Sequence, residues 1–238
     1  MARKILVLGE VRDGSLRNVS FEAVAAAKLA SEGGEVVGVL IGESVQSLGS
    51  EFIQYGTDRV IVVENEKLAQ YTSDGYSQAL LQAIESESPD GIIIGHTAQG
   101  KDLAPRIASK LDSGLISDVT AIEEAGGNVV FVRPIYSGKA FEKKIVKDGL
   151  IFATIRPNNI APLEKDPSRT GEVATLAVDI KDLRTIIKEV VRKATEGVDL
   201  SEAKVVVAGG RGVKSAEGFE PLKELANVLG GAVGASRG

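Results

Sequence analysis

Gly91–Leu111, with the sequence GIIIGHTAQGKDLAPRIASKL, is predicted to form a short strand, a polar loop and a helix. Its three consecutive isoleucines are the kind of apolar run that is typical of a strand buried in a parallel sheet. The helix is predicted from about Gly100 to Leu111. A strand followed by a short loop and a helix is the repeating unit of α/β proteins, so these residues indicate the fold class.

Residues before this stretch repeat the alternation of strand and helix. We expect Ser20 to cap the first helix and Gly33-Gly34 to end it. Alternating strands and helices with short connections predict a parallel sheet with right-handed crossovers. The strands and helices predicted in this part are Lys4–Leu8, Ser20–Ser31, Glu35–Ile41, Arg59–Val63 and Ser73–Glu87.

The pattern changes after about residue 127, where strands follow one another without helices between them. The alternation of apolar and polar residues in AFEKKIV predicts a half-exposed antiparallel strand, and therefore a sheet that is mostly parallel and partly mixed. Asn158–Gly171 carries two prolines and is expected to be a loop. The predicted strands of this part are Asn128–Val132, Ala140–Val146, Leu150–Arg156, Ala174–Ile180 and Thr185–Arg192.

The last 35 residues, Lys204–Gly238, are KVVVAGGRGVKSAEGFEPLKELANVLGGAVGASRG and predict a strand, a glycine-rich turn, a helix and a second strand. That order is how a Rossmann-like nucleotide-binding domain begins. Because Thr195–Ala203 is polar and contains a glycine, we place a domain boundary there. We expect an α/β domain over residues 1–198 and the first strand, helix and strand of a second domain over 199–238.

Composition restricts the classes of function. The chain has 28 Lys and Arg against 33 Asp and Glu, a net charge of −5, which disfavours a nucleic-acid partner. It has no cysteine and His96 is its only histidine, so thiolate chemistry is excluded and a histidine-based metal site is not expected. No apolar run approaches the roughly 20 residues of a membrane span. The start, MARKILVLGE, leads directly into a strand without a leader, which predicts a cytoplasmic protein.

The glycine-rich turn is the first candidate binding site. Gly210 and Gly212 let a backbone approach a ligand closely, Arg211 can pair with phosphate oxygens, and the next helix can present free N–H groups. The glycine spacing is not G-x-G-x-x-G, and an ordinary turn with an exposed arginine is the alternative. Ser236 and Arg237 follow the next strand and are expected at the same edge of the sheet, with a solvated terminus as the alternative.

Two further sites are suggested by residues at strand ends. His96, Thr97 and Gly100 stand between a strand and a helix, where a phosphate or ribose can bind. The alternative there is a capped helix without a ligand. Arg133 and Arg156 each precede a proline at a strand end and can bind anions or the acidic surface of a partner, although arginines in surface turns are common.

Five stretches, taken in their order along the chain, resemble a known family. They are GHTAQGKDLAPRIASKL, FVRPIYSGKA, ATIRPN, KVVVAGGRGVKSAEGF and AVGASR. The chain resembles the alpha subunit of electron transfer flavoprotein over nearly its whole length. The resemblance implies an N-terminal domain that packs on a beta subunit and a C-terminal domain that holds FAD. It places Arg211 and Ser236 in contact with FAD, within a cofactor site that includes Gly210 and Gly212, and Arg237 near the flavin ring.

The function that the resemblance implies is electron transfer in pathways such as fatty acid β-oxidation. FAD takes electrons from acyl-CoA or other dehydrogenases and passes them to a quinone reductase or another acceptor. The protein turns over no substrate of its own, so neither catalytic residues nor a metal are expected. Two further FAD-contacting segments of the family are absent. Lys139 stands where many members have asparagine, and Pro157 stands where some have glycine. We therefore expect a chain that ends before the last part of the FAD domain, and its residues alone do not predict that it retains FAD.

Two other functions remain open from the sequence. The first is an assembly module that binds the beta subunit without FAD. The second is an NAD-dependent oxidoreductase, for which the sequence shows neither the dinucleotide fingerprint nor a convincing proton donor.

Overall fold

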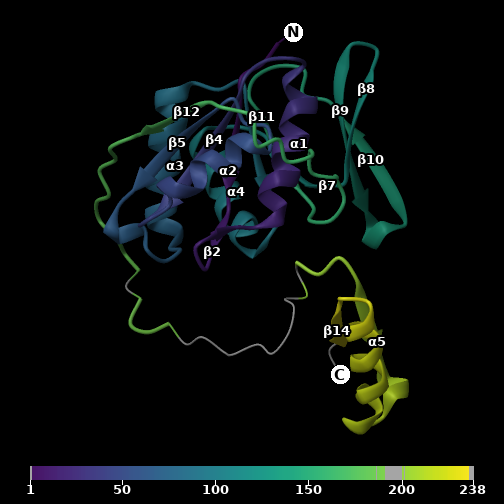
Figure 1. Cartoon of the computed structure of the whole chain (residues 1–238). Helices are drawn as coiled ribbons and strands as arrows, with labels where there is room; N and C mark the ends of the chain where they lie inside the picture. The colour runs from purple at the N-terminus through teal and green to yellow at the C-terminus, as the bar shows by residue number, and fades with distance from the viewer. Residues whose placement is uncertain (1, 186, 191–199, 201, 236–238) are drawn as a thin grey trace. The chain divides into compact units, whose positions relative to one another are not determined.

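The computed structural model describes residues 2–185, 187–190, 200 and 202–235. These residues form two compact units, Met1–Ile187 and Lys188–Gly238, which are described separately. The first unit contains a large parallel sheet with helices on both faces, as the sequence predicts (Figure 1). In the part of the chain that is described, no helix is long and apolar enough to cross a membrane.

The large sheet has seven strands in the order β12-β5-β4-β1-β6-β11-β7, and each neighbouring pair is parallel. Chain order reverses between β1 and β6, so the carboxyl ends of these two strands form the crevice where α/β proteins most often bind ligands. The strands are β1 (Ile5–Gly9), β4 (Val36–Gly42), β5 (Arg59–Glu64), β6 (Gly91–Gly95), β7 (Ile116–Val119), β11 (Ile151–Ile155) and β12 (Glu172–Thr175).

Two hydrophobic clusters cover the two faces of this sheet. Alternate residues of β1 belong to different clusters: Ile5 packs toward α1 (Asn18–Ser31) and α2 (Gly49–Gln54), and Leu6 packs toward α3 (Ser73–Glu87) and α4 (Ala98–Lys110). Complete burial of a side chain of this size stabilises the fold by about 1.5–3 kcal/mol. Because successive side chains of a strand point to opposite faces, the two faces of this one sheet pack against all four helices.

The start of α1 differs from the prediction. The helix begins at Asn18 after Arg17, which makes no side-chain cap. The Ser20 hydroxyl oxygen instead accepts a hydrogen bond from the Glu10 backbone N–H at 2.8 Å, so Ser20 ties the helix to the end of β1. The end of α1 agrees with the prediction, because Glu32 adopts a left-handed conformation and Gly33 follows with φ 84°.

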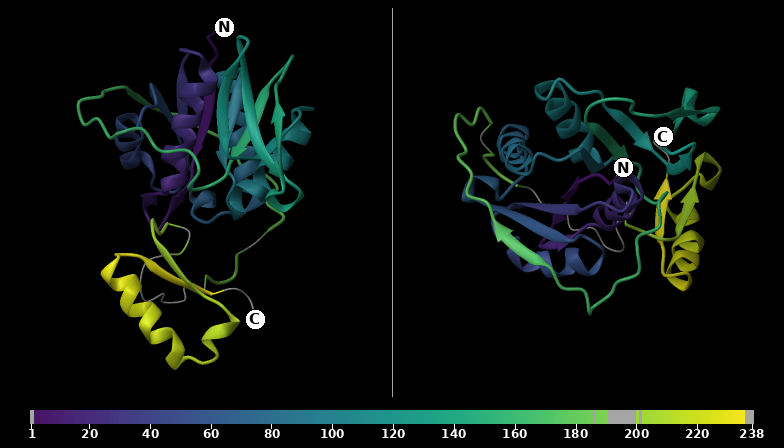
Figure 2. Two further views of the ribbon diagram at one scale, coloured as in Figure 1. Left: turned by 90° about the vertical axis from the view of Figure 1, so that its right-hand side faces the viewer. Right: turned by 90° about the horizontal axis from the view of Figure 1, so that it is seen from above.

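The antiparallel strands form a sheet of their own. It has the order β10-β9-β8 and consists of β8 (Ala121–Ala125), β9 (Asn128–Ile135) and β10 (Ala140–Lys144). Gly126 and Gly127 both have positive φ and make the two-residue turn between β8 and β9. Phe131 is fully buried and anchors this sheet on the α1 side of the core, where Figures 1 and 2 show it beside the helix.

Several short elements were not predicted or have other bounds. Thr185 and Ile187–Val190 lie outside any strand, which corrects the strand predicted for Thr185–Arg192; the remaining residues of that range lie outside the described part. Ile187 and Val190 are exposed, so their β-branched side chains have no core to support a strand. The structure also adds α2, β7, β8 and a small antiparallel pair, β2 (Val11–Arg12) with β3 (Ser15–Leu16).

The second unit has two parallel strands, β13 (Val206–Gly209) and β14 (Ala232–Ala235), joined through α5 (Glu220–Val228). Because Gly209 pairs with Ala235, both strands end at one edge. The helix starts at Glu220, eight residues after Gly212, so its first turn does not follow the glycine-rich turn directly.

Candidate functional site

A cluster of polar side chains lies at the carboxyl ends of β6, β11 and β7. Arg156 donates to both carboxylate oxygens of Asp118, from Nε at 2.8 Å and from Nη2 at 2.6 Å. Asp118 donates its backbone N–H to the Thr154 hydroxyl oxygen at 3.0 Å, and that oxygen lies 2.9 Å from His96 Nδ1. His96 Nε2 lies 3.6 Å from Asp118 Oδ1, so three strand ends are joined by one network.

The surroundings of His96 favour one tautomer of the neutral ring. The Thr154 hydroxyl can donate to Nδ1 or accept from it, because its oxygen has two lone pairs and the Asp118 N–H uses one of them. A proton on Nε2 would face the Asp118 carboxylate, and this attraction favours the form with the proton on Nε2. Asp118 has φ 67°, a left-handed conformation that aspartate adopts more readily than most residues.

The charges in this cluster are set by burial and by the arginine. Burial lowers the pKa of His96 most strongly, and the Asp118 carboxylate opposes the shift. Three nearby cations add to the lowering: Lys101, Arg156 and Arg133. The hydrogen bond from Arg156 is the largest cause that lowers the pKa of Asp118. At neutral pH the network therefore holds a neutral imidazole and an ionised carboxylate that is already paired.

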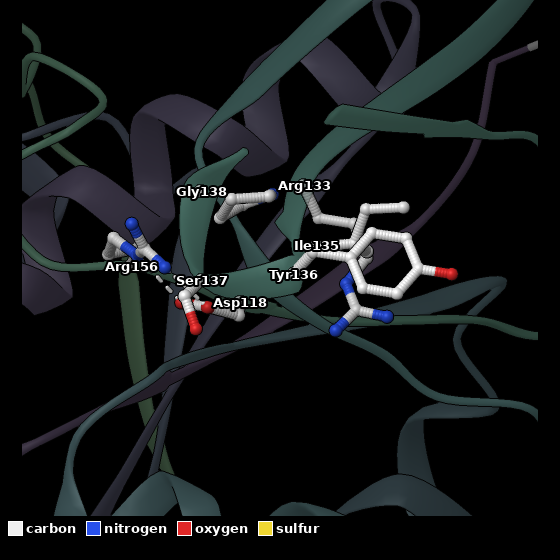
Figure 3. Close-up of a pocket in the computed structure, with 8 residues that line it drawn as sticks. Asp118, Arg133, Ile135, Tyr136, Ser137, Gly138 and Arg156 are labelled. Carbon is white, nitrogen blue, oxygen red and sulfur yellow. Dashed lines mark hydrogen bonds and ion pairs between the residues drawn. The ribbon is translucent and has the colours of Figure 1, made fainter. Parts of the chain in front are cut away.

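Beside this cluster the surface forms a hollow of about 540 Å³ (Figure 3). Arg133 and Arg156, which the sequence predicts at two strand ends, both line it. The prediction is wrong for Arg133, because β9 continues through Pro134 to Ile135 and Pro134 pairs with Phe141. In Figure 3 the Tyr136 ring points away from the Asp118–Arg156 pair. The complete lining is Asp118, Arg133, Pro134, Ile135, Tyr136, Ser137, Gly138 and Arg156. No sequence signal marks Asp118, because its partner is 38 residues away in the chain.

The two arginines of the hollow differ in their partners. Arg156 is engaged by Asp118 through two hydrogen bonds. Arg133 has a single ion pair, with Glu142 Oε2 at 3.5 Å, and within the described residues its buried Nε has no hydrogen-bond partner. Leaving such a donor unpaired costs about 1–3 kcal/mol. Arg133 is therefore less fully paired within the described residues than Arg156, and the nitrogen that lacks a partner is buried away from solvent.

Polar side chains of the protein meet at the carboxyl ends of β1 and β6. Thr97 caps α4 by accepting the Gly100 N–H at 3.1 Å, and its hydroxyl donates to Glu10 Oε2 at 2.6 Å. Arg17 pairs with the other oxygen of Glu10 at 2.5 Å. An acidic side chain at this position disfavours a phosphate. The helix cap that the alternative reading of this segment requires is present at Thr97.

In the second unit, the glycine-rich turn leaves open space beside its backbone. A Cβ added at Gly210 or Gly212 would meet no atom within 4 Å, whereas one at Gly209 would lie 2.6 Å from the Phe219 ring. Packing against Phe219 thus explains why residue 209 is a glycine, whereas the other two glycines border free space. No partner for Arg211 is recorded within the described residues. Ser236 and Arg237 lie outside the described residues.

The turn suits a phosphate-bearing cofactor such as FAD. A ligand can approach the backbone at Gly210 and Gly212, and the Arg211 guanidinium can donate to phosphate oxygens. The turn also lies at the carboxyl end of a parallel strand, the edge at which α/β sheets bind ligands. These features fit the pyrophosphate of a dinucleotide.

Comparison with known proteins assigns the two parts of the chain. Residues 5–181 match the electron transfer flavoprotein domain, and residues 199–238 match the electron transfer flavoprotein FAD-binding domain. The chain is 62% identical to the electron transfer flavoprotein subunit alpha of Bacillus subtilis (strain 168), over all of this chain and 73% of the relative. The chain belongs to the electron transfer flavoprotein alpha-subunit family.

Other relatives of this electron transfer flavoprotein chain are more distant. The electron transfer flavoprotein subunit alpha of Thermoanaerobacterium thermosaccharolyticum is 39% identical over 99% of this chain and 73% of the relative. A protein of Anaerotignum propionicum named acryloyl-CoA reductase electron transfer subunit beta is 32% identical, over 99% of this chain and 73% of the relative. Electron transfer is common to the names of all three relatives.

Proposed function

We propose that this chain is the alpha subunit of a heterodimeric electron transfer flavoprotein that carries electrons through FAD in the cytoplasm. The observation that supports the proposal most strongly is the open turn of Gly210, Arg211 and Gly212. It lies at the carboxyl end of β13, in the part that matches the FAD-binding domain. Residues 1–198 pack on the beta subunit in this proposal, and residues 199–238 open the FAD domain.

The cofactor-site residues have distinct roles in this proposal. When bound, FAD supplies the redox centre that accepts and releases electrons. Gly210 and Gly212 let its phosphates approach the backbone, and Arg211 donates to phosphate oxygens. Ser236 contributes a hydroxyl contact. The resemblance to the family assigns Arg237 to the flavin ring, where its positive charge would stabilise negative charge on the reduced flavin.

In this proposal the electron donors are dehydrogenases, which include the acyl-CoA dehydrogenases of β-oxidation. The electron acceptor is a quinone reductase or another protein. The Anaerotignum propionicum relative, whose name couples electron transfer to an acyl-CoA reductase, supports this class of partner.

An electron-transfer assay tests the proposal. The chain is co-expressed with an electron transfer flavoprotein beta subunit, and the purified pair is mixed with an acyl-CoA and a catalytic amount of acyl-CoA dehydrogenase. We expect the flavin absorbance of the pair to bleach only when the dehydrogenase is present. Oxidation of the acyl-CoA by the pair alone would contradict the role of carrier.

A further inference from the structure

A segment without regular structure continues the chain after β12, which Figure 1 draws in green. The sequence predicts a strand over Ala174–Ile180, but β12 ends at Thr175. The Leu176 N–H still donates to the Val62 carbonyl of β5 at 2.8 Å. Residues 177–185, the strap, belong to no strand or helix. Their backbone groups therefore need partners other than a neighbouring strand.

Two glutamines of α3 bind the backbone of the strap. Gln82 donates through Nε2 to the Asp179 carbonyl at 3.1 Å and accepts the Asp179 N–H at 3.0 Å. Gln78 makes the same pair of hydrogen bonds with Lys181, at 2.7 and 2.9 Å. Side chains four positions apart share one helix face, and the strap residues that they bind are two positions apart, as in an extended chain. This face of α3 therefore holds an extended peptide through its backbone.

Two charged side chains add to these contacts. Lys67 Nζ donates to the Ile180 carbonyl at 2.8 Å, and Asp74 Oδ2 accepts the Arg184 N–H at 3.2 Å. The Asp74 contact lies toward the end of the strap, so the strap is bound along most of its length. Four side chains from outside the strap take the place of a strand partner.

The strap has the features of a segment that opens locally. Its hydrogen bonds with Gln78, Gln82 and Asp74 are exposed to solvent. Among the strap residues Ile180 alone is buried, whereas β1 and β6 are buried at every residue. Few buried apolar contacts and solvent-exposed backbone hydrogen bonds mark the segments of a fold that open most easily. The strap can therefore open while the large sheet stays folded.

The strap lies next to the boundary between the two units. The first unit extends to Ile187 and the second begins at Lys188. With the strap bound, the connection to the second unit leaves α3 after Thr185. With the strap open, it leaves the edge of the large sheet after Leu176. Each residue of an extended chain spans up to about 3.3–3.6 Å, so the released residues increase the distance that the connection can cover.

We propose that residues 177–185 are a releasable strap, which Gln78 and Gln82 hold on α3, and that its release lengthens the reach of the connection to the second unit. The bound strap keeps the connection short, and the open strap adds its residues to it. The inference is independent of the proposed electron-transfer function, because it uses only contacts within the first unit.

Hydrogen exchange of the full chain tests the release. In the wild type, the N–H groups of Asp179 and Lys181 should exchange at least about a hundredfold faster than that of Ile93 in β6. Replacing both glutamines, Gln78→Leu with Gln82→Leu, removes the hydrogen bonds to the two strap residues. Their exchange should then be about tenfold faster or more, with Ile93 unchanged. Exchange of all three groups at one slow rate would make the strap part of the core and overturn the proposal.

A matched variant controls for the change of residue type. Gln99→Leu is the same substitution on α4, and within the described residues Gln99 makes no hydrogen bond with the strap. It should leave the exchange of Asp179 and Lys181 at the wild-type rate. Faster exchange in Gln99→Leu, equal to that of the double variant, would contradict the role of Gln78 and Gln82.

Two measurements follow the released strap itself. Trypsin should cut after Lys181 about tenfold faster in the double variant. Cleavage after Lys188, which is exposed and lies outside the strap, should not change. X-ray scattering should give the double variant a larger maximum dimension than the wild type. An unchanged dimension in a chain whose Lys181 site has become sensitive would overturn the longer reach.

Discussion

His96 is the only histidine of the chain, so its titration can be followed without ambiguity. Its surroundings oppose protonation, chiefly through burial, while Asp118 favours protonation. Nuclear magnetic resonance of the imidazole should give a midpoint below the ordinary value of about 6.5. In Asp118→Asn the midpoint should fall further, since an opposing negative charge is removed. A wild-type midpoint above 6.5 would contradict the described burial of the ring.

The same shift makes stability depend on pH. The folded chain binds a proton at His96 less readily than the unfolded chain does, so this residue stabilises the fold above pH about 6.5. The contribution is lost as the pH falls from that value through the lower pKa of the folded state. Urea denaturation should therefore show a stability loss over this range that is smaller in His96→Gln. Equal losses in both proteins would refute this linkage.

Among the proposed cofactor residues, Arg211 is the one that a substitution tests most directly. Arg211→Ala removes up to two charge-assisted hydrogen bonds to phosphate, each worth about 1.5–3 kcal/mol, so FAD affinity should fall about tenfold or more. The measurement is the FAD content of the purified pair at fixed protein concentration. Lys223→Ala, another exposed cation of the second unit, serves as the control because it pairs with Glu220. Equal FAD content in wild type and Arg211→Ala would rule out the assigned contact.

At the scale of elements, β6 and α4 are held close together by a glycine. A Cβ at Gly100 would lie 1.8 Å from the Gly95 backbone oxygen, so Gly100→Ala must push the helix away from the strand. We expect a loss of about 1–3 kcal/mol in the free energy of unfolding. Gly114→Ala is the control, because a Cβ there meets no atom within 4 Å and φ lies outside the positive range. Similar stability of the two variants would contradict this packing.

The elements also differ in how far sequence predicts them. β6 and α3 have the predicted bounds, since a buried apolar run and a long amphipathic segment each carry a strong local signal. The strand predicted from Thr185 is absent over its described residues, because burial and not β-propensity decides whether a strand forms. The pairing of Asp118 with Arg156 depends on which strands become neighbours, and a single sequence does not reveal that order.

At the scale of the whole molecule, the two units have unequal cores. Both large hydrophobic clusters lie in the first unit. In the described part of the second unit the buried apolar side chains are alanines, and Val206, Leu225 and Val228 are exposed. The first unit therefore has the core to fold on its own. That property supports the alternative of an assembly module without FAD, and flavin content separates the two functions.

The visible spectrum of the purified pair tests the central claim most directly. The chain is co-expressed with an electron transfer flavoprotein beta subunit, and the complex is isolated by size exclusion. We predict that the two chains elute together with the absorption bands of oxidised flavin, and that denaturation releases FAD. A complex that elutes as a pair without any flavin absorbance would contradict an FAD-dependent electron carrier.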